Sequence, residues 1–600
     1  MRGIMLYLDW NKWLLVLAAF ILHVIPLSSQ VSVSPLLTTS WHQQSPYNLQ
    51  CPMTTVGGNT HSAAGCGAIA VSQILTKYKK PVHGYGHSYY ENTSSGNMTD
   101  VDYSLLTMEW DKVKNSYSST YSGTESEDAV ASIVYQVGAA MQMSYGTSSA
   151  PKNMGQMMWG LHHFLHISPD SRYRRRCFYS TAEWMRMLSR ELTAGRPVFY
   201  RGEWHYDDQS AAHIFVLDGV NEDGMFHANY GHSSKYNRFV SLNILNYNDQ
   251  YAIPGGRVVC YNFGQAMITD FFPVDGLTDE DYSSHSLILT DNIFFTDNTS
   301  VRQKRMSLGG ILKLKMKLRD CSLTGGATPF GIGVYQNGQL LRVLRDNTHM
   351  EVTFSVGGYE GNRVCNVTLP TDLENGQYEM KLVFSDDAGL SWQPVWDNAP
   401  NHIDMAVNNN SVLLTLSPNY MSPTHLYLRE PIHQVYNVCE GYPLGQGTAF
   451  RVALRNPTVN NFENLIKFEF YIDDSIKTYE VKCPIYGCCD VDFDILIPES
   501  KINLNDKSYT YKAYYYEHNL GDYIELTTLP SSSSGDVNDD GRVSIEDVTL
   551  LIDNLLKGDI SDVGLFAVDC NADGVFSISD VVALIDSLLS GKDYHYMKDA

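Results

Sequence analysis

A cysteine at the start of a predicted helix is the first candidate for chemistry. Cys66 follows the small residues 62–65 and begins a stretch, 65–78, whose apolar residues recur at helical spacing. A thiol at a helix N-terminus lies at the positive end of the helix dipole, which favours the nucleophilic thiolate. The small neighbours leave room for the backbone of a substrate. A buried or disulfide-bonded cysteine is the alternative that this position leaves open.

A histidine, an asparagine and a glutamine complete a possible nucleophilic centre. His213 heads the apolar run 213–219, a predicted buried strand, and small residues precede it. The side-chain carbonyl of Asn229 could accept a hydrogen bond from the imidazole and fix its orientation. The amide of Gln43 could donate to an oxyanion. The alternative for His213 is a core histidine with satisfied hydrogen bonds.

Two repeated loops near the C-terminus have the oxygen pattern of a calcium site. Each has oxygen-bearing side chains at positions 1, 3, 5, 9 and 12, a glycine at 6, and a main-chain carbonyl to complete the ring at 7. The predicted ligands are Asp536, Asn538, Asp540, Arg542, Ser544 and Asp547 in the first loop and Asp569, Asn571, Asp573, Val575, Ser577 and Asp580 in the second. The same apolar helical face follows both loops. One such loop could be a chance surface turn, but the repetition predicts two bound Ca²⁺ ions.

The charge balance excludes one broad class of function. The chain has 600 residues, with 43 basic and 66 acidic side chains and a net charge of −23. A nucleic-acid binder draws its affinity largely from Lys and Arg on phosphates, so this balance argues against one. The last 66 residues hold 14 acidic and 4 basic residues. The densest negative charge therefore coincides with the calcium loops.

The N-terminus predicts export. Arg2 and Lys12 precede the apolar run 13–25, which ends in the small-residue segment 26–29. This is typical of a signal peptide over residues 1–29, with a retained membrane anchor as the alternative, although the run is short for a span of about 20 residues. We expect a secreted, cell-surface or periplasmic protein without a membrane span after cleavage. Export places the 11 cysteines in an oxidising setting, and their odd number leaves at least one unpaired within the chain.

The rest of the chain is predicted to fold as several domains. Mixed helical and strand patterns over 30–275 predict an α+β domain. Short alternating segments with turn signals predict all-β sandwich domains at 285–417 and 418–528. A Ser-rich linker, 529–535, then leads to a small all-α module with the calcium loops at 536–591.

Several motifs in consistent order carry a resemblance to a known family. They are Trp-x-Gln-x-x-Pro-Tyr-Asn at 41–48, Gly-Cys-x-Ala-x-Ala-x-x-Gln-Ile at 65–74, and the segments 143–150, 197–202 and 213–219. Over about 41–270 the chain resembles the streptopain family of papain-fold cysteine peptidases, which includes interpain.

The resemblance implies a papain-like fold and a catalytic mechanism without a cofactor. It assigns Cys66 as nucleophile, His213 as general base and acid, and Gln43 with the Cys66 backbone N–H as the oxyanion hole. Asn229 stands where the family motif Asn-Trp-Gly-Trp begins. Protein or peptide substrates with a hydrophobic P2 side chain are implied.

The C-terminal loops resemble a second family. Residues 535–591 are similar to a type I dockerin, including the aspartate at position 12 of each loop. This resemblance implies two Ca²⁺ ions and a cohesin as partner. A calcium-stabilised terminal cap without a cohesin is the alternative.

Three departures from the peptidase pattern bear on activity. Tyr230 and His232 replace the two tryptophans of the family motif, and Ala212 replaces the usual glycine before the histidine. Only a short segment separates the predicted signal exit from Trp41, whereas the family carries an inhibitory prosegment. We therefore expect either no zymogen stage or restraint by the later domains. The hypothesis is an exported cysteine endopeptidase, and the alternative is a catalytically inactive adhesion or scaffold protein assembled through its dockerin.

Three further groups are predicted to be structural. The histidines of 160–166 could offer a pair to zinc, but a solvated helix face is expected. The arginines of 172–176 are expected in an exposed loop. Trp392 and Trp396 could stack on sugars, but a sandwich core is expected to take them.

Overall fold

The fold is taken from a computed structural model of the whole chain. It describes residues 32–590 except 55–59, 93–97, 152–153, 180, 207–208, 223, 243–260, 262, 278–286, 299–301, 321–325, 346–349, 355–359, 386, 398, 418–425, 436–446, 457–461, 474, 486–488, 500, 505–506, 518–521, 529–534, 536, 538–542, 558–569 and 571–576. The predicted signal peptide lies outside the described residues. Among the helices that are described, none has the length and apolar character needed to cross a membrane.

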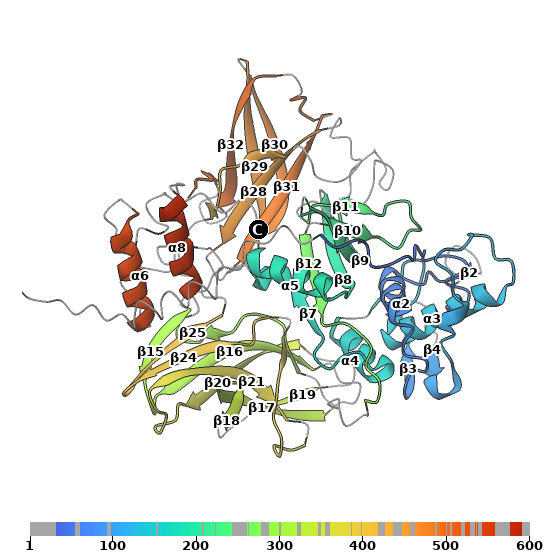
Figure 1. Ribbon diagram of the computed structural model, residues 1–600, viewed down its shortest axis with the longest axis horizontal. Helices are drawn as coiled ribbons and strands as arrows, with labels where there is room; N and C mark the ends of the chain where they lie inside the picture. The colour runs from blue at the N-terminus through green and yellow to red at the C-terminus, as the bar shows by residue number, and fades with distance from the viewer. Residues whose placement is uncertain are drawn as a thin grey trace, which may run out of the picture.

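The N-terminal region, residues 32–275, is built on an antiparallel sheet in the order β11–β10–β9–β8–β12–β7 (Figure 1). The strands are β7 (Arg172–Arg175), β8 (Val198–Tyr206), β9 (Gln209–Val220), β10 (Phe226–Asn229), β11 (Arg238–Val240) and β12 (Phe263–Thr269). The helices are α2 (Cys66–Tyr78), α3 (Glu125–Ala140), α4 (Met154–Leu165) and α5 (Thr181–Thr193). This arrangement confirms the prediction of an α+β region.

Alternation along β8 and β9 divides the core of this region into two layers. Phe199 and Ile214 pack with α2, α3 and α4 on one face of the sheet. Tyr200 and Phe215, their neighbours in sequence, pack with α5 on the other face. Successive side chains of a strand point to opposite faces, so a sheet covered on both sides needs apolar residues at every position. This explains the continuous apolar runs in the sequence.

The middle β region, residues 287–416, has two facing sheets among its described strands. The first is ordered β14–β16–β13–β23 with β20 beside β16, and the second β15–β25–β24–β21–β17–β18 with β19 and β22 at its margins. Their inner side chains form one core. The strands are β13 (Leu287–Leu289), β14 (Phe294–Phe295), β15 (Gln303–Ser307), β16 (Ile311–Asp320), β17 (Gly326–Gln336), β18 (Gln339–Leu344), β19 (Glu351–Phe354), β20 (Glu360–Thr368), β21 (Gly376–Phe384), β22 (Gln393–Pro394), β23 (Trp396–Asp397), β24 (Ile403–Asn408) and β25 (Ser411–Leu416).

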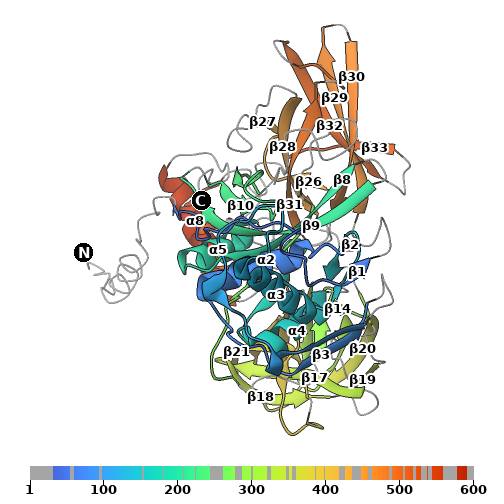
Figure 2. The same ribbon diagram turned by 90° about the vertical axis from the view of Figure 1, so that its right-hand side faces the viewer.

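The C-terminal β region, residues 426–526, projects from the N-terminal region on the side opposite the middle β region (Figure 2). One sheet has the order β26–β28–β27 with β31 beside β28, and another has the order β30–β29–β32–β33. Their shared core is rich in aromatic residues such as Phe450, Phe468 and Phe470. The strands are β26 (Tyr427–Leu428), β27 (His433–Val435), β28 (Gly447–Asn456), β29 (Phe462–Ile472), β30 (Ser475–Ile485), β31 (Cys489–Pro498), β32 (Tyr509–Glu517) and β33 (Asp522–Glu525).

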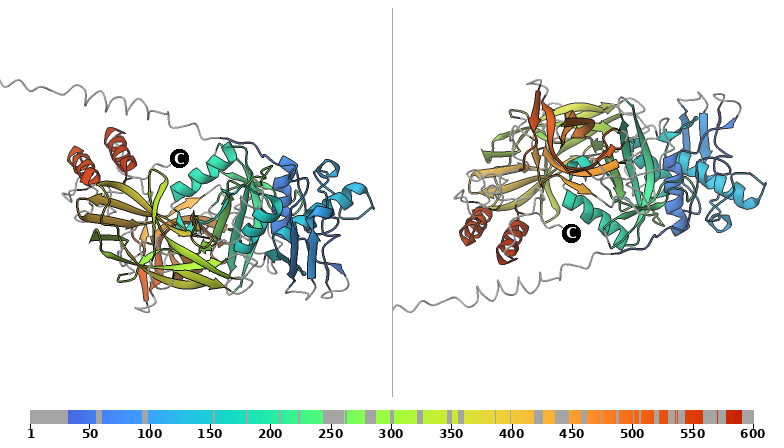
Figure 3. Two further views of the ribbon diagram at one scale, coloured as in Figure 1. Left: turned by 90° about the horizontal axis from the view of Figure 1, so that it is seen from below. Right: turned by 90° about the horizontal axis from the view of Figure 1, so that it is seen from above.

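The last described elements, helices α6 (Ile545–Lys557) and α8 (Ile578–Ser590), lie side by side at the end of the molecule opposite α2 and α3 (Figure 3). Their core follows the sequence repeat, because its members occur in pairs 33 residues apart. These pairs are Val537 and Cys570, Val548 and Val581, and Leu551 and Leu584. The repeat therefore makes a small core with internal symmetry.

Each β region takes one phenylalanine of the N-terminal region into its own core. Phe178, which ends the turn after β7, belongs to the core of the middle β region. Phe263, the first residue of β12, belongs to the core of the C-terminal β region. Burying an aromatic ring of this size contributes on the order of 2 kcal/mol. The regions are therefore packed against one another through shared apolar cores.

The arginines of 172–176 do not form the exposed loop predicted from the sequence. They make edge strand β7 and a turn that face the middle β region. Arg175 donates to the carbonyl of Thr290 at 3.0 Å, and buried Arg176 donates to Gln265 at 3.0 Å. A backbone carbonyl of the middle β region and a side-chain amide of β12 thus accept hydrogen bonds from these two arginines, which the local charge pattern does not reveal.

Two other structural predictions are also wrong, because the residues concerned are buried between regions of the chain. The helix face at 160–166 is not solvated, because His162 is fully buried and its Nε2 lies 2.7 Å from Ser171 Oγ. Trp396 is not in the core of a sandwich but packs against the core of the N-terminal region. Its ring meets His162 edge-on, with 4.7 Å between ring centroids, and Arg172 lies over it. Burial between regions of the chain places these residues.

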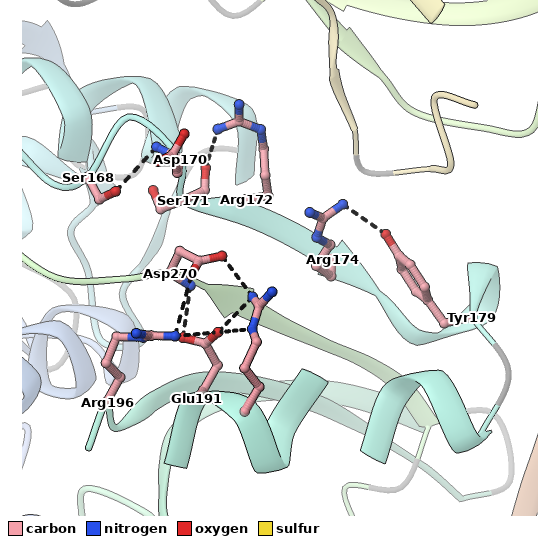
Figure 4. Close-up of polar contacts among 10 residues, drawn as sticks. Ser168, Asp170, Ser171, Arg172, Arg174, Tyr179, Glu191, Arg196 and Asp270 are labelled. Carbon is pink, nitrogen blue, oxygen red and sulfur yellow. Dashed lines mark hydrogen bonds and ion pairs between the residues drawn. The ribbon is translucent and has the colours of Figure 1, made fainter. Parts of the chain in front are cut away.

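A buried carboxylate joins α5 to the end of β12 (Figure 4). The side chain of Glu191 is 1% exposed and accepts hydrogen bonds from Arg196 Nε at 2.6 Å and Arg190 Nη2 at 2.8 Å. It also accepts the backbone N–H of Asp270 at 3.0 Å. Burial by itself would raise the pKa of Glu191, but the hydrogen bonds from Arg196 and Arg190 outweigh it and hold the pKa below the ordinary value.

Replacing Glu191 with alanine is expected to destabilise the N-terminal region by about 3 kcal/mol near neutral pH, because it leaves buried donors unpaired. The carboxylate's pKa is lowered by folding, so its stabilisation is complete above the ordinary carboxyl pKa and is lost as the pH falls through the lowered value. Differential scanning calorimetry at neutral and acidic pH measures both effects. Asp372→Ala, which breaks an exposed pair with Arg342, is the control and should change little. Equal destabilisation by both variants would contradict this assignment.

Candidate active site

Cys66 lies at the first turn of α2, and a glycine makes this position possible. Gly65 has φ +92°, and a Cβ there would lie 2.2 Å from Met143 Cε and 2.7 Å from the Ser149 carbonyl oxygen. Only glycine fits such a close approach at a positive φ. No described side chain caps the start of α2. The N–H groups of the first turn are therefore not used by a capping side chain, which suits the binding of a developing negative charge.

The thiol of Cys66 is partly buried beside strand β9. Burial raises the pKa of the Cys66 thiol, while the backbone N–H groups of Ile214 and Gly67 and the positive charge of Arg201 oppose the rise. The expected gain from the helix dipole is therefore outweighed by burial. Because Ile214 follows His213 directly, this contact also places the sulfur next to the part of β9 that carries the histidine.

His213 is buried and oriented by a backbone carbonyl. Its Nε2 lies 2.8 Å from the carbonyl oxygen of Tyr230, and the residue is 6% exposed. A carbonyl only accepts, so Nε2 must carry the proton and Nδ1 is left with the lone pair that a general base needs. The sequence predicted that Asn229 would orient the imidazole. In the structure the acceptor is instead the backbone of the next residue, Tyr230.

Asn229 has a different contact set. Its side-chain amide donates to the Thr39 carbonyl at 2.7 Å and to Gln73 Oε1 at 3.2 Å. Gln73 Oε1 also accepts the backbone N–H of Trp41 at 3.1 Å. Asn229 thus ties β10 to α2 and to the N-terminal segment. Gln73 lies two helical turns after Cys66, inside the motif at 65–74, so the spacing could have identified it.

Gln43 is held close to the nucleophile through its backbone. Its carbonyl accepts the N–H of Ala64 at 2.9 Å, two residues before Cys66. The neighbouring N–H of Trp41 is fixed to Gln73 in α2. The structure therefore brings the segment of Gln43 to the start of α2, where an oxyanion hole needs an amide donor.

Aromatic rings and histidines surround His213. The His213 ring centroid lies 5.2 Å from that of Tyr261, 5.2 Å from that of His232 and 6.1 Å from that of Phe215. Burial lowers the pKa of His213 to about 3, and the nearby His232 adds to this effect, whereas the hydrogen bond to Tyr230 opposes it. His232 stands 5.4 Å from His42, and burial lowers its pKa too. His213 is thus a neutral imidazole near neutral pH.

The two pKa shifts predict how Cys66 reacts. With the pKa of His213 at about 3 and that of Cys66 raised, the resting pair is a thiol and a neutral imidazole. Only the thiolate is alkylated quickly, so the rate with iodoacetamide should climb with pH and show no plateau between about pH 4 and pH 8. Peptide mapping separates this site from buried Cys51, whose pKa is raised to about 12. A plateau in that range would instead indicate a thiolate–imidazolium pair.

The described residues of the predicted calcium loops have matching geometry. Asp547 Oδ2 accepts the N–H of Ser544 at 2.7 Å, and Asp580 Oδ2 accepts the N–H of Ser577 at 2.7 Å. Both aspartates are fully buried. Buried carboxylates at position 12 fit a Ca²⁺ loop, in which this side chain is a ligand. The other predicted ligands, Asp536, Asn538, Asp540, Arg542, Asp569, Asn571, Asp573 and Val575, lie outside the described residues.

Comparison with known proteins matches two parts of the chain to family models. Residues 41–239 match the Peptidase C10 family, and residues 534–589 match the dockerin type I domain. The first match contains Gln43, Cys66, His213 and Asn229.

Individual relatives cover the same N-terminal region. The chain is 29% identical over 224 residues to the thiol protease/hemagglutinin PrtT of Porphyromonas gingivalis, with 36% of this chain and 25% of that protein covered. It is 26% identical over 222 residues to streptopain of Streptococcus pyogenes, with 34% and 54% covered. The chain thus spans between a quarter and about half of these relatives. The active wild-type interpain A cysteine protease of Prevotella intermedia is 32% identical, with a TM-score of 0.36 over 41% of this chain and 97% of that one.

Proposed function

Since the chain belongs to the peptidase C10 family through residues 41–239 and carries a dockerin type I domain at 534–589, we propose that it is an exported cysteine endopeptidase with a calcium-dependent docking module. Its substrates are proteins or peptides, and its catalytic residues are Cys66, His213 and Gln43. Asn229 has a positioning role, because it ties the strand next to the histidine to the helix of the nucleophile.

One observation carries the proposal. The thiol of Cys66 lies at the N-terminus of α2 against the backbone of Ile214, directly after a histidine whose only lone-pair nitrogen is Nδ1. A nucleophile, a base of fixed tautomer and N–H donors at a helix start are the three parts that acyl transfer needs.

The reaction follows from these parts. Nδ1 of His213 takes the proton of Cys66, and the sulfur attacks the carbonyl carbon of the scissile peptide bond. The oxyanion accepts hydrogen bonds from the Gln43 amide and the Cys66 backbone N–H. His213 then gives its proton to the leaving amine, which departs and leaves a thioester. Water, deprotonated by His213, hydrolyses the thioester and restores the thiol.

The test compares the full chain with its Cys66→Ala variant on casein under reducing conditions. Hydrolysis by the wild type alone supports the proposal. Absence of hydrolysis by both supports the alternative, a catalytically inactive adhesion or scaffold protein, which Tyr230 and His232 in place of tryptophans would fit. Hydrolysis by both would place the nucleophile elsewhere.

The other parts of the chain have supporting roles in the proposal. We divide the chain into a signal peptide at 1–29, a peptidase domain at 30–275, β-sandwich domains at 285–417 and 418–528, a linker at 529–535 and a dockerin at 536–591. The apolar cores of the two β regions, each of which takes only Phe178 or Phe263 among its buried members from the N-terminal region, and the core of the helical pair support this division. The dockerin would bind two Ca²⁺ ions and a cohesin outside the cell or at its surface.

A further inference from the structure

Two aromatic residues, one just before β12 and one at its first position, connect the catalytic histidine to the C-terminal β region. Tyr261 is 8% exposed and packs on the imidazole of His213, with 5.2 Å between ring centroids and 33° between ring planes. Phe263, two residues later, is buried in the core of the C-terminal β region. Only two positions in the sequence thus separate the ring that packs on His213 from the ring that lies in the core of the C-terminal β region.

The ring of Tyr261 completes an aromatic wall around the imidazole. Its centroid lies 6.2 Å from that of Phe215 and 6.4 Å from that of Tyr230, and these two rings lie 4.8 Å apart. Tyr230 also supplies the carbonyl that His213 Nε2 bonds. A ring in this position keeps water from competing for that hydrogen bond and limits rotation of the imidazole.

The sheet is shaped to let Tyr261 approach. A Cβ at Gly202 would lie 2.0 Å from the carbonyl oxygen of Tyr261 and 2.8 Å from its Cβ. Gly202 is the β8 residue that pairs with His213. Any larger residue there would push Tyr261 away from the strand of the histidine, so the glycine of the motif at 197–202 has a structural reason.

The second half of the connection is the packing of the C-terminal β region. Strand β30 lies against β8 and β12, and Phe263 pairs with Glu203 of β8 in the sheet. The side chain of Phe263 shares its core with Phe468 and Phe470 of β29. The position of β12 at its first residue is therefore fixed by a domain that carries no predicted catalytic residue.

We propose that Tyr261 is a positioning residue for His213, and that the C-terminal β region holds it in place through Phe263. The proposal rests on the proposed peptidase function. It gives the C-terminal β region a role in catalysis. If Phe263 no longer packed in the core of that region, the Tyr261 ring would become more mobile and would orient His213 less well.

The test uses the full chain with Tyr261→Ala, Tyr261→Leu and Tyr261→Phe. Tyr261→Phe keeps the ring and should stay within about twofold of the wild-type kcat. Tyr261→Ala and Tyr261→Leu remove it and should lower kcat by about ten- to hundredfold with little change in KM. Water then reaches the imidazole, so the acid limb of the kcat/KM profile should move to higher pH, toward the ordinary histidine value. Tyr261→Leu keeps apolar volume and provides the folded comparison if Tyr261→Ala unfolds.

Matched variants separate positioning from a general loss of packing. Phe263→Ala and Phe470→Ala each remove one ring from the same core, but only the first is next to Tyr261. Phe263→Ala should shift the acid limb, and Phe470→Ala should not. An equal shift by both, or an unchanged acid limb in Tyr261→Ala and Tyr261→Leu, would overturn the proposal.

A readout independent of activity distinguishes this proposal from the peptidase function itself. The ring nitrogens of His213 can be titrated by nitrogen-15 NMR of histidine-labelled protein, with the signal assigned by its loss in His213→Asn. If the wild type hydrolyses nothing, the peptidase function fails. A raised titration point in Tyr261→Leu would still support the role of Tyr261, and an unchanged one would overturn it.

Discussion

A chain carrying His213→Asn is expected to hydrolyse casein about a thousandfold more slowly than the wild type, because His213 is the base assigned to move protons to and from Cys66. The asparagine amide reaches only the position of Nδ1, so the variant also loses the donor at Nε2, which lies 2.8 Å from the carbonyl oxygen of Tyr230. The variant therefore removes the base together with the hydrogen bond that orients it. The loss should appear in kcat, since the imidazole acts on the reacting atoms and contributes little to binding.

His232 supplies the matched control for this variant. Its Nδ1 lies 3.0 Å from the same carbonyl of Tyr230, and its ring is 5.2 Å from that of His213. The family motif has tryptophan at this position, so we expect His232→Asn to retain activity within about tenfold. Initial rates of casein hydrolysis are measured for both variants. Their melting temperatures should equal that of the wild type, which shows that a loss of rate is not a loss of folding. If His232→Asn lost more activity than His213→Asn, the base would have been assigned to the wrong histidine.

The sequence predicted the elements that hold the nucleophile and the base. Apolar spacing placed a helix at 65–78 and a strand at 213–219, and the structure has α2 at Cys66–Tyr78 and β9 at Gln209–Val220. Both patterns are local, and both elements are buried along the face that the pattern marks. The family resemblance implied that Gln43 would lie near Cys66, and in the structure the Gln43 carbonyl accepts the N–H of Ala64, two residues before Cys66.

The sequence did not predict contacts that depend on distant parts of the chain. The acceptor of His213 is a backbone carbonyl, and every residue has one, so side-chain types could only suggest Asn229. Tyr261 packs on His213 because β12, which follows it, pairs with β8 in the sheet. The side chain of Phe263 is buried in the core of the C-terminal β region. Likewise Trp396 covers His162 from the middle β region. These side chains are placed by packing between regions of the chain, and a local sequence pattern cannot predict such packing.

Replacing Asp547 and Asp580 with asparagine is expected to abolish high-affinity Ca²⁺ binding to the C-terminal module. Each aspartate is fully buried, and its Oδ2 accepts a serine N–H at 2.7 Å. Asn keeps the size of the side chain but exchanges one oxygen for an NH₂ group, which neither accepts a hydrogen bond nor binds a cation. The substitution therefore removes the negative charge of position 12 and one of its two ligand oxygens from both loops.

Calorimetric titration of the chelator-treated chain measures the result. The wild type should bind about two Ca²⁺ per chain and the double variant none, and each single variant should bind about one. Glu546→Gln and Ser579→Ala are the matched controls, because these exposed residues directly precede the two aspartates. Both should leave the stoichiometry unchanged. Two ions per chain in the double variant would mean that the ligands lie elsewhere.

The same variants report how metal binding couples to folding. A ligand that binds only the folded state adds about 2.7 kcal/mol of stability at a concentration of 100 times its Kd. Helices α6 and α8 share one core, in which Leu551 of the first repeat packs with Leu584 of the second. Loss of one ion should therefore weaken both helices, so Asp547→Asn alone should lower the Ca²⁺-dependent melting temperature of the whole module. Independent melting of the two repeats, followed by circular dichroism with and without chelator, would contradict this coupling.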